Sequence, residues 1–363
     1  MFRTLARTAL VCGLAAVGST TAGAVEKIVY ATYMSEVYTI SKVDLWVMNE
    51  VEKRSNGQVK FEKYFSGALL KAPDLYPGLQ NGAADMVLGT PSAYNRADFR
   101  LSNVTLPYIS SKADAVGKAL SDLYAGNPAL RREYESRNAR VLYMVPWAEN
   151  TFWSSKPLAK ADDFKGLKVR SVQSIADAVK KLGGTPVAMA WPEALDALGR
   201  GVVDVVSSSP FDSSVLGGIY ESARVGTDGG DMGIFSSAVA AFNLQRWNAL
   251  KPELRKIIEE VSAEAPARFL TELNGELDKG VEKLCAYKGD LKITLFPEAE
   301  RAKIHGSVAK ALQDEWVKWA AETTRADTAG LLKQYVDLVR KHEAASTWQS
   351  GFQRYTARNC GRS

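Results

Sequence analysis

The sequence is poor in the side chains that most enzymes use for acid–base and nucleophilic chemistry. It has two histidines in 363 residues, His305 and His342, and both lie in polar stretches beside lysines. The usual signatures of metalloproteases, serine hydrolases and nucleotide-binding proteins do not occur. No acidic cluster points to a metal ion. We therefore expect a protein that is not an enzyme, with no catalytic residues, no cofactor and no metal site.

Cysteine is also scarce, with three residues. Cys12 lies in the N-terminal segment, which leaves Cys285 and Cys360. In an oxidising compartment such a pair is expected to form a disulfide, which here would tie the end of a long helical segment to the C-terminal tail. Two unrelated thiols are the alternative, and metal ligation is disfavoured because no partner residues occur at a suitable spacing.

Neither a strong net charge nor a long apolar run follows the N-terminal segment. Residues 1–24 combine two arginines, a short apolar run and the cleavage-site pattern Ala22-Gly23-Ala24, which is typical of a secretory signal peptide. Without these residues the formal net charge falls from +5 to +3, which is too small and too evenly spread to indicate a nucleic-acid partner. We expect an exported periplasmic protein, a monomer, without a membrane-spanning helix.

What the sequence does contain is one alternation of strand and helix patterns that occurs twice. The first copy reads, in order, KIVYATY, a helical run with Ile40, Val43, Val47 and Val51 on one face, QVKFEKY, and NGAADMVLGTP. The second copy reads KVRS, SIADAVKKLGG, PVAM, WPEALDALGRG and VVDVVSSSP. Both copies share a turn with glycine and aspartate, Gly82 with Asp85 and Gly201 with Asp204, before an apolar strand. This repeat predicts two similar α/β lobes with mixed, largely parallel sheets.

The later part of the chain connects and completes these lobes. A long helix is predicted to start near Pro252, and LKITLF at 291–296 reads as one more strand. We assign residues 25–149 and about 236–275 to the first lobe. Residues 150–235 and about 276–363 are assigned to the second lobe.

Polar residues follow the predicted strands of both lobes. Arg170 ends one strand, and Thr90 and Ser207–Ser209 end two others. In open α/β sheets ligands bind beyond the carboxyl ends of the strands, so these residues are expected to meet at one cleft. A buried guanidinium there would suit an anion, because it stays charged and donates a planar pair of hydrogen bonds to a carboxylate. A salt bridge within one lobe is the alternative role for Arg170.

The order of these motifs resembles the substrate-binding proteins of TRAP transporters, the DctP-type family. The resemblance rests on DDFKGLKVRS, LGGTPVAMAWPEALDALGRGVVD, SNGQVKFEKYFSGALL, LQNGAADMVLGTPS and RWNALKPELRKIIEEV, and covers nearly the whole chain after residue 24. It implies a two-lobed, periplasmic-binding-protein-like fold with a hinge and a long helix spanning both lobes. It also implies that the protein captures a small organic acid and delivers it to the small and large membrane subunits of a permease.

The resemblance also assigns binding residues. Arg170 matches the family's principal carboxylate clamp, and Trp191 matches an aromatic residue that lines the cleft, although a core tryptophan is the alternative. Gln173, Thr90 and Ser208 occupy positions that relatives use for polar ligand contacts.

Two departures from the family pattern bear on the ligand. Thr151 stands where many relatives have a second arginine, and serines at 207 and 208 replace an acid and an amide. Both changes argue against sialic acids and dicarboxylates. We expect a monocarboxylate with a hydrophobic or aromatic body, or alternatively a sulfonate. The aromatic residues expected to line the pocket are Tyr33, Phe152, Trp153, Trp191 and Phe211. Two other functions stay open at this point: a ligand-sensing module for a receptor, and an exported hydrolase or lyase on the same scaffold.

Overall fold

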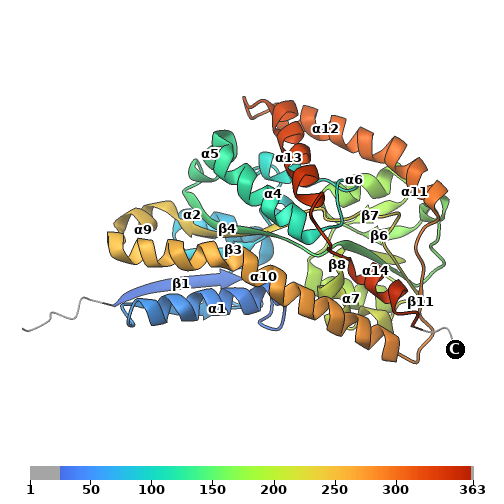
Figure 1. Ribbon diagram of the computed structural model, residues 1–363, viewed down its shortest axis with the longest axis horizontal. Coiled ribbons are helices and arrows are strands. Elements are labelled where there is room, and N and C mark those ends of the chain that lie inside the picture. The colour runs from blue at the N-terminus through green and yellow to red at the C-terminus, as the bar shows by residue number, and fades with distance from the viewer. Residues whose placement is uncertain (1–24, 361–363) are drawn as a thin grey trace, which may run out of the picture.

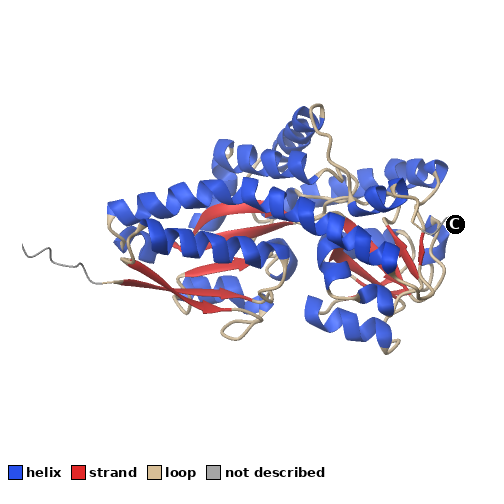
Figure 2. Cartoon of the chain, turned by 60° about the horizontal axis from the view of Figure 1, so that its bottom comes forward, coloured by secondary structure: helices blue, strands red, loops and turns tan. Residues whose placement is uncertain are grey.

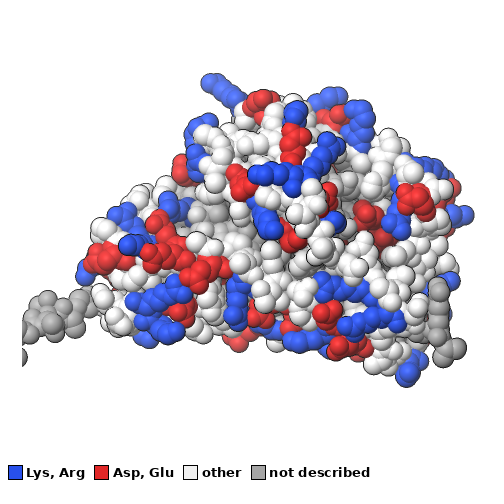
Figure 3. Space-filling view, viewed as in Figure 1, with Lys and Arg blue, Asp and Glu red and all other residues white. Residues whose placement is uncertain are grey.

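The computed structural model describes residues 25–360, so the predicted signal peptide lies outside the described residues. Two α/β lobes, each built on one sheet, lie side by side and are covered by helices (Figures 1 and 2). No helix in this part of the chain is long and apolar enough to cross a membrane. Lysine, arginine and acidic side chains alternate over the face drawn in Figure 3, without a large area of one sign.

The first lobe contains a five-stranded sheet. Its strand order is β2 (Val59–Tyr64), β1 (Glu26–Thr32), β3 (Met86–Gly89), β10 (Ser237–Asn243) and β4 (Ala139–Pro146). β1 pairs in parallel with β2 and β3, whereas β10 is antiparallel to both of its neighbours. The α-helices of this region are α1 (Thr39–Arg54), α2 (Leu75–Asn81), α3 (Pro91–Tyr94), α4 (Ala113–Gly126), α5 (Pro128–Glu135) and α9 (Leu244–Ala249).

The second lobe contains a six-stranded sheet. Its strand order is β11 (Lys292–Ile293), β9 (Val225–Thr227), β5 (Asn150–Ser154), β8 (Val205–Pro210), β6 (Lys168–Arg170) and β7 (Thr185–Val187). Its helices include α6 (Gln173–Lys181), α7 (Trp191–Gly199) and α8 (Phe211–Leu216). Of the strand predicted at 291–296, only Lys292–Ile293 pairs with a neighbour.

The mixed character of both sheets follows from how the chain crosses between the lobes. β4 leads out of the first lobe into β5, and β9 leads out of the second lobe into β10. β5 and β10 therefore enter their sheets from the side on which the other strands end. For this reason each of them is antiparallel to both of its neighbours. The carboxyl ends of β3, β6 and β8 consequently face the space between the lobes.

The repeated glycine–aspartate turn has the same structure in both lobes. Gly82 and Gly201 have φ angles of 79° and 69°, a left-handed conformation that glycine adopts without a Cβ clash. Asp85 accepts a hydrogen bond from the backbone N–H of Val29 on β1, and Asp204 accepts one from Lys168 on β6, both at 2.9 Å. Each aspartate thus fixes the start of a buried strand to the neighbouring strand.

Helix α10 (Pro252–Ala286) spans both lobes, as predicted (Figure 1). It packs against α1 and β4 of the first lobe and against α8 and α14 (Gly351–Ala357) of the second. Most of its buried side chains, from Leu254 to Leu284, are apolar and recur every three or four residues along one face. The predicted disulfide joins Cys285, at the end of α10, to Cys360.

The remaining helices cover both lobes. They are α11 (Glu298–Ile304), a short π-helical turn (His305–Ala309), α12 (Lys310–Ala321) and α13 (Thr328–Glu343). α13 packs against α4 of the first lobe, and α12 contacts α6 of the second. The predicted assignment of residues 276–363 to the second lobe therefore does not describe α13.

Candidate functional site

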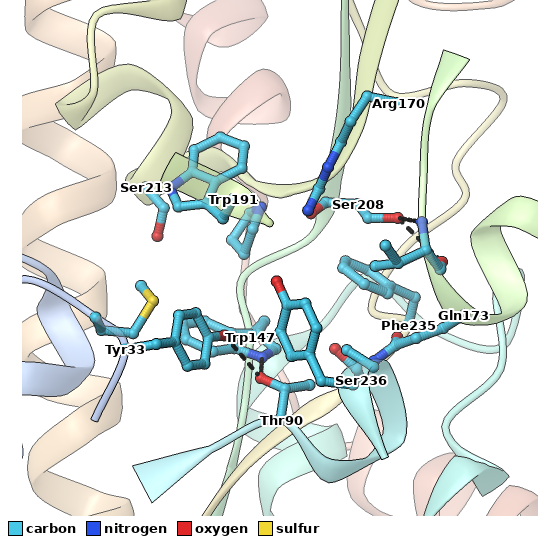
Figure 4. A pocket seen from close by; sticks show the side chains of 15 residues that line it. Tyr33, Thr90, Trp147, Arg170, Gln173, Trp191, Ser208, Ser213, Phe235 and Ser236 are labelled. Carbon is cyan, nitrogen blue, oxygen red and sulfur yellow. Dashed lines mark hydrogen bonds between the residues drawn. The ribbon is translucent and has the colours of Figure 1, made fainter. Parts of the chain in front are cut away.

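A cavity lies between the two lobes. The first lobe contributes residues that follow β1 and β3, and the second contributes residues from β6, α6, α7, β8 and α8. The connections between the lobes complete the walls (Figure 4). The lining residues are Tyr33, Met34, Thr90, Ala93, Tyr94, Trp147, Arg170, Val172, Gln173, Trp191, Ser208, Pro210, Ser213, Phe235 and Ser236.

Arg170 is a buried cation in this cavity, with 1% of its surface exposed. Its Nε and Nη2 donate to the carbonyl oxygen of Met189 at 3.2 and 2.8 Å. Its Nη1 donates to the carbonyl oxygens of Ser207 and Ser208 at 2.9 and 3.0 Å. Four of the five N–H groups are thereby held by backbone oxygens, and one on Nη2 is left for another acceptor.

No carboxylate among residues 25–360 forms an ion pair with the guanidinium, although Glu193 attracts it from farther away, and the backbone groups that it binds are neutral carbonyls. Burial lowers the pKa of Arg170, while the nearby Tyr94 and Tyr33 hydroxyls oppose this shift. Arginine nevertheless stays protonated in proteins. A buried charge without a counterion is costly, and an anion bound beside it would relieve that cost.

Two residues with strained backbone conformations line the cavity with the arginine. Gln173 and Ser208 have φ angles of 56° and 52°, in the left-handed region that non-glycine residues rarely adopt. The Ser208 hydroxyl accepts from the backbone N–H of Val172 at 2.9 Å and lies 3.1 Å from the Val172 carbonyl oxygen. It thereby ties the segment after β6 to β8, whose carbonyl groups hold Arg170. Strain of this kind is typical of functional sites.

The wall opposite Arg170 is aromatic. The Thr90 hydroxyl accepts from Trp147 Nε1 at 3.2 Å and lies 3.3 Å from the Tyr33 hydroxyl. Tyr33 and Tyr94 meet edge to face, with ring centroids 5.3 Å apart. Thr90 therefore holds aromatic rings in place at the cavity surface.

Four polar contacts join the lobes beside the cavity. They connect Gln173 Nε2 to Ser92 Oγ at 3.0 Å, Trp191 Nε1 to Tyr38 Oη at 3.3 Å, Arg96 Nη2 to Asp177 Oδ2 at 2.8 Å and Thr39 Oγ1 to Asp212 Oδ2 at 2.6 Å. Each pair takes one residue from the first lobe and one from the second. In this conformation the lobes therefore touch on more than one side of the cavity.

Six of the ten residues predicted from the sequence line the cavity, namely Tyr33, Thr90, Arg170, Gln173, Trp191 and Ser208. The other four, Thr151, Phe152, Trp153 and Phe211, lie in the protein core instead. Thr151, Phe152 and Trp153 do not line this cavity because β5 is an interior strand whose side chains are buried on both faces. Phe211, the first residue of α8, is buried in the core instead.

The buried contacts of these four side chains are specific. Thr151 Oγ1 accepts from Trp153 Nε1 at 2.7 Å, donates to the Ser209 carbonyl oxygen at 2.6 Å and lies 2.9 Å from Ser209 Oγ. It therefore does not take the place of an arginine at the cavity. Phe152 packs on Phe164 with ring centroids 5.2 Å apart. Trp153 and Phe211 both pack on Phe352, at 5.8 and 5.2 Å.

Sequence reasoning missed several lining residues, above all Tyr94, Trp147, Ser213, Phe235 and Ser236. Tyr94 lies four residues after Thr90 on the helix that follows β3, so helical spacing from the strand end could have indicated it. Trp147, Phe235 and Ser236 lie on the connections between the lobes, where the sequence shows no periodic signal.

Known protein families include one that matches most of this chain. A family model described as bacterial extracellular solute-binding protein, family 7, the DctP family, matches residues 35–318. The chain belongs to this family. The DctP family provides solute-binding proteins of TRAP transporters, so the resemblance drawn from the sequence is confirmed. Such proteins are extracytoplasmic binding components of a transport system rather than enzymes.

Individual relatives agree with this assignment. The C4-dicarboxylate-binding periplasmic protein DctP of Rhodobacter capsulatus is 27% identical over 291 residues, which cover 78% of this chain and 82% of the relative. A TRAP solute-binding protein of Rhodoferax ferrireducens, solved with benzoate, is 22% identical with a TM-score of 0.75, over 88% of this chain and 98% of that one.

A second solved relative is a marine metagenome TRAP solute-binding protein in complex with metahydroxyphenylacetate. It is 22% identical with a TM-score of 0.78, over 88% of this chain and 99% of that one. These structures confirm the two-lobed fold of the TRAP-type protein described here.

Proposed function

We propose that this TRAP-type solute-binding protein captures a monocarboxylate with an aromatic or otherwise hydrophobic body in the cavity between its lobes. The observation that carries the proposal is that Arg170 lies without an ion-pair partner in a cavity that five aromatic side chains also line. The remaining N–H of Nη2 donates to the ligand carboxylate, whose charge neutralises the guanidinium.

The aromatic wall contributes most of the remaining affinity. A charge-assisted hydrogen bond contributes about 1.5–3 kcal/mol net, whereas a micromolar Kd needs about −8 kcal/mol. Burial of apolar ligand surface adds about 25 cal/mol per Å². The cavity offers five aromatic side chains for this burial, namely Tyr33, Tyr94, Trp147, Trp191 and Phe235. The structural relatives that hold benzoate and metahydroxyphenylacetate support an aromatic ligand.

A dicarboxylate fits this cavity poorly, although a relative binds C4-dicarboxylates. Among the described residues that line the cavity, Arg170 is the single lysine or arginine. A second carboxylate would therefore be buried without a cation, at a cost of several kcal/mol.

Capture and delivery follow from the arrangement of the lobes. The segments after β4 and β9, together with α10, act as the hinge, and the contacts between the lobes stabilise the closed form. We further propose that the chain is exported to the periplasm by residues 1–24. There the closed form presents the acid to the small and large membrane subunits of a TRAP permease.

Titration calorimetry of the purified chain with benzoate, phenylacetate, succinate and benzenesulfonate tests the ligand class. We expect micromolar or tighter binding of an aromatic monocarboxylate and binding of succinate at least about tenfold weaker. Tighter binding of succinate than of every monocarboxylate would contradict the proposal. Tighter binding of benzenesulfonate than of the carboxylates would indicate that the ligand of this protein is a sulfonate.

A further inference from the structure

Three buried side-chain atoms at the cavity have no hydrogen-bond partner within the described chain. They are Gln173 Oε1, Ser213 Oγ and Ser236 Oγ, and their side chains are at least nine-tenths buried. Buried polar atoms in native proteins are almost always hydrogen-bonded, so three unpaired ones around one cavity call for an explanation. In Figure 4, Gln173 and Ser236 lie together on one side of the cavity, away from Ser213 and Trp191.

Gln173 is the most informative of the three. Its Nε2 donates to Ser92 Oγ of the first lobe at 3.0 Å, and its Oε1 has no partner. An amide oxygen can only accept a hydrogen bond. The strained φ angle of 56° shows that the chain holds this residue in an unfavourable conformation at the cavity surface.

The following inference rests on the function proposed above. We propose that Gln173 is a specificity-determining residue that accepts a hydrogen bond from the body of the ligand. The ligand class is then a hydroxylated aromatic monocarboxylate rather than the unsubstituted acid. The carboxylate binds at Arg170 and the ring lies among the aromatic side chains. The ring hydroxyl donates to Gln173 Oε1 and accepts from the neighbouring Ser236 hydroxyl.

This arrangement connects ligand recognition with the contact between the lobes. The ligand hydroxyl and Ser92 bind opposite ends of one amide group, so a ligand that donates to Oε1 also holds Nε2 toward the first lobe. A ligand without the donor leaves Oε1 buried and unpaired in the closed protein. Sites built to bind a hydroxyl reject analogues without it for this reason.

Calorimetry with matched ligands tests the proposal. The panel contains benzoate, the 2-, 3- and 4-hydroxybenzoates, and the corresponding fluorobenzoates, in which fluorine has a similar size but cannot donate. We expect at least one hydroxybenzoate to bind about tenfold more tightly than both benzoate and its fluoro counterpart. The inference is overturned if no hydroxy isomer exceeds benzoate, or if the fluoro counterpart binds equally well. Failure of all these acids to bind would instead overturn the proposed ligand class, and the inference with it.

Two variants separate recognition of the hydroxyl from contact between the lobes. Gln173→Met keeps the side-chain length but removes the acceptor, so the ratio of benzoate to hydroxybenzoate Kd should fall to about one. Ser92→Ala removes the contact between the lobes and keeps the Gln173 acceptor, so both acids should weaken while hydroxybenzoate stays the tighter ligand. Measurable benzoate binding by Gln173→Met shows that the variant is folded. An unchanged ratio in Gln173→Met would exclude the assigned role.

Discussion

The two lobes are built on the same plan but present different chemistry at the ends of their strands. In both, a glycine–aspartate turn precedes a buried strand, and the aspartate binds the backbone of the neighbouring strand. In the first lobe β3 leads to Thr90, whose hydroxyl is already engaged by Trp147 and lies near that of Tyr33. In the second lobe β6 leads to Arg170, whose charge has no counterion in the described chain.

This difference shows that two lobes with the same fold can contribute different functional groups to one binding cleft. The second lobe supplies the charge that attracts an acid, and the first lobe supplies Tyr33 and Tyr94 to the aromatic surface that covers it. The second lobe also carries a covalent link, because Cys285 and Cys360 join the end of α10 to the segment after α14. If the lobes differ in this way, substitutions in the two lobes should differ in their effects on stability and on ligand affinity.

Loss of the disulfide should give the largest effect, and it should act on stability alone. The bridge closes a loop with a sequence separation of 75 residues, for which chain entropy predicts a stabilisation of about 4 kcal/mol. The double variant Cys285→Ser/Cys360→Ser should lose roughly this free energy of unfolding in urea denaturation, and limited proteolysis should cut first near the end of α10. The ligand Kd should stay unchanged under native conditions. A Kd that rises as much as stability falls would show that the bridge also shapes the cavity.

Arg170 and Thr90 should differ in their effect on binding. Arg170→Ala leaves the ligand carboxylate unpaired in a buried cavity, so calorimetry should show at least about a tenfold loss of affinity. Thr90→Val keeps the side-chain volume and removes only the hydroxyl that holds the aromatic rings, so we expect a loss of about threefold. Equal losses would contradict the division of roles between the lobes. Thermal unfolding of both variants without ligand serves as the control for folding.

The elements with a strong local pattern could be predicted from the sequence. The strand ending at Arg170 and the long helix from Pro252 were correct because alternation and helical spacing reflect which face of each element is buried. The repeat also predicted correctly that Arg170, Thr90 and Ser208 lie at one cavity, because in each lobe the strands end at the edge that faces the other lobe.

The aromatic part of the cavity could not be predicted in the same way. Phe152 and Trp153 of β5 are buried in the core, whereas Trp147, three residues before that strand, lines the cavity. Apolar side chains in a core and in a ligand cavity have the same composition, and only tertiary structure tells them apart. β10 (Ser237–Asn243) was not predicted either, because all seven of its residues are buried and it shows no alternation.

Substitution of the repeated aspartates, Asp85 and Asp204, should have the smallest effect on stability. It also compares equivalent positions in the two lobes. Asp85→Ala and Asp204→Ala each remove one side-chain hydrogen bond to a neighbouring strand, so each should lower the free energy of unfolding by about 1 kcal/mol. Only Asp204 fixes the strand that carries Arg170, since its partner Lys168 lies two residues earlier on β6. Asp204→Ala should therefore also weaken ligand binding by about threefold, because a displaced β6 moves the guanidinium away from the acid. If Asp85→Ala weakens binding equally, then the first lobe positions the ligand as strictly as the second, and the charge at β6 does not alone determine where the acid binds.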